Sequence, residues 1–145
     1  MDPIAAALLL LDREAPTKNI EIQSTPDDPR RRTYVVPTVQ GRRQIVYAAP
    51  VADPLVGERL DFLAVAAKKL PNDPQLFVGL LAVARDLRRA RLCVFDRNNP
   101  QLAAVASFVP DDIHDAAGPR LLHALREVAA VADSIERQMS GADTL

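Results

Sequence analysis

The segment from Pro119 to Met139 constrains the fold most strongly, because its apolar residues keep a helical spacing for about three heptads. Leu122 and Ala129 widen this apolar stripe into a face suited to covering a sheet. The pattern therefore predicts a long amphipathic helix that packs through one side. The stripe itself is formed by Leu121, Leu125, Val128, Ala132, Ile135 and Met139.

Short apolar runs in the first half of the chain are typical of strands. Asn19–Thr25 alternates apolar and polar residues, and Thr33–Gln40 and Arg43–Val51 meet at Gly41, which tolerates a positive φ. We expect these last two runs to form a tight hairpin. Pro37 cannot donate a ladder hydrogen bond, so we expect its strand to lie at a sheet edge or to carry a bulge.

A second hairpin is predicted from Leu92–Phe95 and Leu102–Val109, which are joined by a polar corner at 96–100. The second of these runs is rich in alanine. Such small side chains let a helix approach the sheet closely, which fits the amphipathic segment that follows.

Three further helices are predicted from an aspartate followed by proline, a pairing typical of a helix start. Asp2 precedes the apolar run Ile4–Leu11, which has no basic region before it and is too short to span a bilayer. After Asp53, apolar residues recur every three or four positions, and this spacing predicts a helix to about Leu70. Asp73 begins the next helix.

The predicted order is α-β-β-β-α(α)-β-β-α, and the fold class is α+β: a two-layer sandwich of an antiparallel sheet packed against helices. The 145 residues suit a single domain, 1–145, and 48% hydrophobic residues suffice for its core. A net charge of −1 provides no basic field for nucleic acid or for anionic membranes, so neither partner is expected. The single cysteine leads us to expect the cytoplasm.

Catalytic templates are missing, so we expect no enzyme, no cofactor and no metal site. The glycines are scattered rather than gathered in a phosphate loop, and zinc-like spacings do not occur. The alternative is a metal- or small-molecule-responsive regulator that uses the cluster Asp111, Asp112, His114 and Asp115. We favour a structural role, in which these residues end a strand and begin the last helix.

Four arginines cluster around the end of the helix that begins at Asp73: Arg85, Arg88, Arg89 and Arg91. Cations there complement the helix dipole, and we favour this interpretation over a phosphate or nucleic-acid patch. Cys93 lies between apolar residues and is expected to be a buried hydrophobe rather than a nucleophile. His123 is expected to serve packing rather than metal ligation.

The second half resembles the type III secretion chaperone-like superfamily, including its YbjN-type members and related adaptors. The resemblance rests on "ARDLRRA", "RLCVFD", "RNNP", "QLAAVASFVP" and "RLLHALREVAAVADSIERQM" taken in order. It implies a small cytosolic, non-enzymatic and often dimeric protein that binds a partner chain along its sheet and helix surfaces.

We therefore expect a protein-binding adaptor or chaperone-like protein that forms a homodimer. The edge strand at Thr33–Gln40 would receive an extended peptide or pair across a two-fold axis. The last helix would leave two apolar side chains for a second subunit. The predicted contact residues are Tyr34, Val36, Thr38, Leu122 and Met139.

Overall fold

The computed structural model describes residues 2–23, 27–95, 98–110 and 113–144, with the side chains of 115 and 140–144 left out. Its six strands form one antiparallel sheet in the order β1-β2-β3-β4-β6-β5. The elements are α1 (Pro3–Glu14), η1 (Ala15–Lys18), β1 (Glu21–Gln23), β2 (Arg32–Pro37), η2 (Val39–Gly41), β3 (Arg43–Asp53), β4 (Gly57–Ala67), α2 (Pro74–Arg85), β5 (Arg91–Phe95), β6 (Gln101–Phe108), η4 (Asp115–Ala117) and α3 (Gly118–Thr144). The α+β class and the antiparallel sheet are confirmed.

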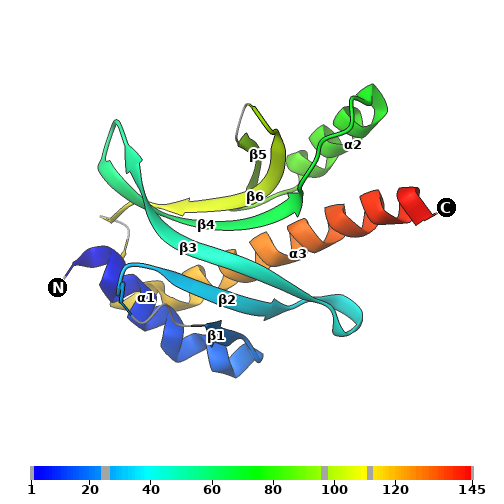
Figure 1. Ribbon diagram of the computed structural model, residues 1–145. Helices are drawn as coiled ribbons and strands as arrows, with labels where there is room; N and C mark the ends of the chain where they lie inside the picture. The colour runs from blue at the N-terminus through cyan, green and yellow to red at the C-terminus, as the bar shows by residue number, and fades with distance from the viewer. Residues whose placement is uncertain (1, 24–26, 96–97, 111–112, 145) are drawn as a thin grey trace.

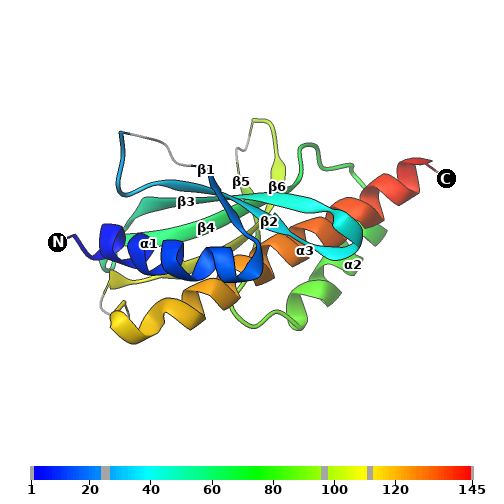
Figure 2. The same ribbon diagram turned by 90° about the horizontal axis from the view of Figure 1, so that it is seen from below.

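The helices α1 and α3, from opposite parts of the sequence, cover one face of the sheet (Figures 1 and 2). The third helix, α2, does not cover this face but lies beside the C-terminal part of α3. α3 packs on β3, β4, β6 and α1. The predicted apolar stripe supplies this contact, since Leu121, Leu125 and Val128 are fully buried. Hydrophobic burial between the helices and the sheet thus builds the core.

The first helix begins as its sequence predicts. Asp2 is the N-cap, and its Oδ2 accepts a hydrogen bond from the backbone N–H of Ala5 at 2.9 Å. Ile4, Leu8 and Leu11 are buried against the rest of the core.

The helix predicted from Asp53 to Leu70 is wrong, because residues 57–67 form strand β4 at the centre of the sheet. Asp53 does bind backbone N–H groups, but it closes a turn: its Oδ1 accepts from Leu55 at 2.8 Å and Val56 at 3.1 Å. Gly57 leaves that turn with a φ of 85°. From Phe62 to Ala67, β4 is apolar on both faces of the strand, so its apolar spacing imitated a helix.

The edge position predicted for Thr33–Gln40 is also wrong, because β2 lies between β1 and β3. β1 pairs only with Thr33–Val35, so it stops short of Pro37. Proline is therefore tolerated where β2 locally has no neighbour on that side. The predicted hairpin turn is confirmed, with positive φ at Gln40 and Gly41.

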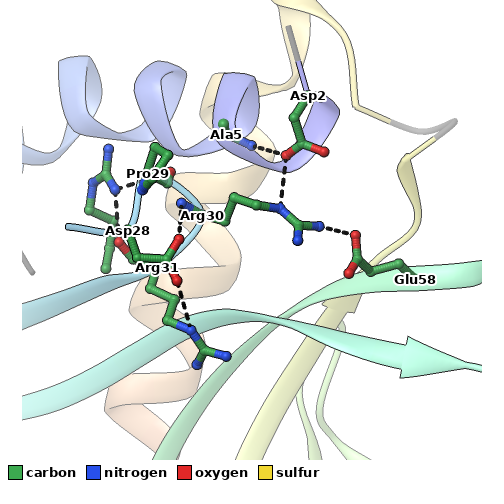
Figure 3. Close-up of polar contacts among 8 residues, drawn as sticks. Asp2, Ala5, Asp28, Pro29, Arg30, Arg31 and Glu58 are labelled. Atoms are coloured by element: carbon green, nitrogen blue, oxygen red, sulfur yellow. Dashed lines mark hydrogen bonds and ion pairs between the residues drawn. The ribbon is translucent and has the colours of Figure 1, made fainter.

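An arginine connects the start of α1 with the sheet. Nε of Arg30 donates to Asp2 Oδ2 at 3.2 Å, and its Nη2 pairs with Oε1 of Glu58 on β4 (Figure 3). The N–H of Ala5 and the charge of Arg30 together hold the pKa of Asp2 below its usual value. The helix cap is thus also a tertiary contact.

Candidate functional site

The most unusual surface belongs to α2, whose sequence PQLFVGLLAVAR has one charged residue, at its end. Only Leu80 is buried in this helix. Phe77 is 40% exposed, Val78 63% and Leu81 72%. A helix that is apolar around most of its circumference is normally buried, so this surface is typical of a contact with another molecule. We call Phe77, Val78 and Leu81 the α2 face.

A groove of about 610 Å³ lies between the start of α2 and the end of α3. Leu70, Leu76 and Met139 provide its apolar lining, and Lys69 and Asp73 bring charges of both signs. Met139, a predicted contact residue, is half-buried and also lines a neighbouring hollow of about 440 Å³. The structure therefore brings this one predicted residue beside the α2 region.

Two other predicted contact residues, Tyr34 and Val36, point into the core. They are 0% and 1% exposed, so neither side chain presents a surface to a partner. The Tyr34 hydroxyl donates to Oδ1 of Asp12 on α1 at 2.9 Å, and Arg32 donates to the other oxygen at 3.1 Å. Burial and the charge of Asp12 raise the pKa of Tyr34. This cluster joins α1 to the sheet.

Thr38 lies just after the end of β2 and is half-buried, and its hydroxyl oxygen is enclosed. Across from this turn lies Asp133 of α3, which is 1% exposed. Its oxygens accept from Nε of Arg42 at 2.7 Å and Nε of Arg137 at 3.1 Å. Burial alone would raise the pKa of Asp133, but the hydrogen bond and charge of Arg42 outweigh it and lower the pKa.

Leu122 is also largely buried, at 8% exposure, so α3 uses it against the core. Its neighbour His123 is exposed, and Nε2 lies 3.8 Å from Oε2 of Glu127. Oε1 of Glu127 accepts hydrogen bonds from the backbone N–H groups of Arg89 and Ala90 at 2.8 and 2.5 Å. Glu127 thereby holds the α2–β5 connection against α3.

The face of the sheet opposite α1 and α3 has a partly exposed apolar area and a polar end. Ile45 and Tyr47 are exposed on β3. Arg59 donates to both oxygens of Asp61 at 2.8 and 3.2 Å, and the Ser107 hydroxyl donates to Oδ1 of Asp61 at 2.6 Å. Arg59 balances the charge of Asp61 within β4, and the hydrogen bond from Ser107 joins β4 to β6.

The acidic cluster before α3 is only partly described, since Asp111 and Asp112 lie outside the described residues, as does the side chain of Asp115. His114 is exposed, and its Nδ1 accepts from the N–H of Ala116 at 3.2 Å. This contact begins the turn that leads into α3. Among the described residues, no group of three or more His, Cys, Asp and Glu side chains is placed to hold a metal ion.

Cys93 lies in β5, opposite Ala103 of β6, and is half-buried. Burial raises the pKa of its thiol, although the charge of Arg91 acts in the opposite direction. The protonated thiol is a poor nucleophile.

The comparisons with known proteins find neither a matching family model nor a matching curated protein. Across the described ranges, none of the helices has the length and apolar character needed to cross a membrane. The surfaces described above are therefore the features that bear on function, and the α2 face among them could not be recognised from sequence. Its apolar spacing looks the same whether the helix is buried or exposed.

Proposed function

We propose that this chain is a non-enzymatic protein-binding adaptor that forms a homodimer through α2. The observation that carries the proposal is the α2 face, where Phe77, Val78 and Leu81 are exposed on a helix almost without charge. Placing such side chains against another apolar surface removes them from water and stabilises the complex.

A second copy of the chain is a suitable occupant, because the adjoining groove has both charge signs at its rim. Lys69 and Asp73 line one groove, and Lys68 and Glu136 line the neighbouring hollow. In a two-fold arrangement the same patch meets itself, so a lysine of one copy can approach a carboxylate of the other. A patch of one charge sign would repel its own copy.

A partner polypeptide would then use the sheet edge at β5. β5 pairs with β6 on one side only, and its Val94 is exposed. An edge strand offers unpaired backbone N–H and C=O groups to an extended peptide. The proposal thus keeps strand addition as the binding mode but assigns it to β5 instead of β2.

The mass in solution tests the dimer. Sedimentation equilibrium should give twice the chain mass of 15.8 kDa for the wild type, and a single chain mass for Leu81→Glu. Leu9→Glu is the matched control, because Leu9 is also an exposed leucine but lies on α1. A wild type that stays monomeric at all concentrations, or a Leu9→Glu variant that dissociates equally, would contradict the proposed dimer.

A further inference from the structure

An open hollow of about 700 Å³ lies beside the start of β5, away from the α2 face. β5 begins at Arg91, opposite Val105, so β6 continues beyond it to Phe108 without a β5 residue alongside. The α2–β5 connection and the first turns of α3 enclose this end of β6. We call the space the arginine hollow; it is lined by Arg88, Arg89, Ser107, Pro119, Arg120 and His123.

The lining carries three guanidinium groups and, among its described residues, no carboxylate. Arg88 and Arg89 are exposed, and neither guanidinium forms an ion pair within the described ranges. Glu127 binds backbone N–H groups of the connection, and Asp61 behind Ser107 is paired with Arg59. These acids therefore do not neutralise the guanidinium groups of Arg88 and Arg89.

The helix dipole does not account for this cluster. α2 ends at Arg85, with Asp86 as its C-cap, so Arg88 and Arg89 lie beyond the last turn where the dipole acts. The guanidinium carbon of Arg89 lies 5.8 Å from the centre of the Phe108 ring, a cation–π distance that orients the side chain at the hollow. Arg88 and Arg89 thus bring two positive charges to one side of the hollow, where they attract an anion.

We propose that the arginine hollow binds the phosphate group of a small phosphorylated molecule. Guanidinium groups donate paired hydrogen bonds in a planar fork that matches phosphate oxygens. A phosphate ester has charge and oxygens enough for Arg88 and Arg89 together, whereas a single carboxylate is saturated by one such fork. The volume of about 700 Å³ exceeds that of a phosphate ion and leaves room for an organic part.

Isothermal titration of the full chain with inorganic pyrophosphate tests the site. We expect binding that weakens about tenfold or more when Arg88 and Arg89 are both changed to glutamine, since each removes charge-assisted hydrogen bonds. Arg85→Gln is the matched control and should bind as the wild type does, because Arg85 is exposed but does not line the hollow. Amide chemical shifts should move at 88–89 and 120–123.

Titrations with further ligands show which kind of phosphate-containing molecule the hollow binds. A sugar phosphate that binds more tightly than inorganic phosphate, and is displaced by pyrophosphate, supports the proposal. The proposal is overturned if millimolar pyrophosphate moves no resonance around the hollow, or if the Arg88/Arg89 double variant still binds normally. It is also overturned if only an oligonucleotide binds, with a steep salt dependence. Leu81→Glu should retain pyrophosphate binding, so failure of the proposed dimer is separable from failure of this site.

Discussion

Two neighbouring leucines of α2 should separate folding from association, because Leu80 is 9% exposed and Leu81 is 72% exposed. Leu80→Ala removes a buried side chain, and we expect it to lower the free energy of unfolding by about 2 kcal/mol, at the low end for buried leucine because α2 is packed on one side only. Leu81→Ala should change that free energy by less than about 0.5 kcal/mol. The two variants have the same chemistry, so position alone accounts for the difference.

Association should show the opposite order. Full burial of a leucine side chain is worth about 1.5–3 kcal/mol, and the exposed 72% of Leu81 thus makes about 1–2 kcal/mol available to a partner surface. The dimer should therefore weaken about 5- to 30-fold for each substituted side chain that becomes buried. Urea unfolding, at concentrations where the wild type is monomeric, measures stability, and sedimentation measures association. Equal loss of stability in both variants, or unchanged association of Leu81→Ala, would refute this reasoning.

Three further substitutions or treatments probe the folded chain. The lowered pKa of Asp133 means that its ionised form adds stability above about pH 4, and that this contribution is lost as pH falls through the lowered value. Unfolding free energy should consequently fall less steeply in Asp133→Asn than in the wild type during acid titration; parallel curves would be inconsistent with this role. Tyr34→Phe removes the hydrogen bond to Asp12 and should lower the free energy of unfolding by about 0.5–1.5 kcal/mol in urea, while an unchanged midpoint and slope would mean that the bond adds no stability. Iodoacetamide should alkylate Cys93 more slowly in the folded chain than in urea-unfolded chain at the same mildly alkaline pH, because burial raises its pKa; equal rates would show a reactive thiol.

The elements best predicted from sequence are those whose pattern is long and consistent. α3 keeps its apolar spacing through several turns, and Leu121, Leu125 and Ile135 are all buried as expected. Asp2 and Asp73 both cap helices whose first residue is proline. In these segments the local capping chemistry and the apolar periodicity favour the same structure.

Strand β4 could not be separated from a helix because two structures use the same local chemistry. An aspartate that accepts from the next N–H groups begins a helix at Asp73 but closes a β-turn at Asp53. The difference depends on Gly57, whose positive φ turns the chain back, and on pairing with β3 and β6. Pairing between distant strands is tertiary information that a short sequence window does not contain.

The candidate sites could not be predicted from the sequence, because they too depend on contacts between distant parts of the chain. Tyr34 and Val36 alternate as an edge strand would, yet both side chains are buried in the core, and β1 pairs with β2 on the side that was expected to be open. The arginine hollow combines Arg88 and Arg89 with Arg120 and His123, which meet only because the β5–β6 hairpin returns the chain between them.

The position of α3 affects how the chain folds during synthesis. All six strands precede α3 in the sequence, yet α3 covers β3, β4 and β6 and also contacts α1. The strands therefore leave the ribosome before α3 can cover their apolar side. The contact between α1 and α3 also forms late, because α3 begins more than a hundred residues after α1 ends. The core thus closes only after α3 has been synthesised, and until then the apolar side of the sheet stays exposed to non-specific association.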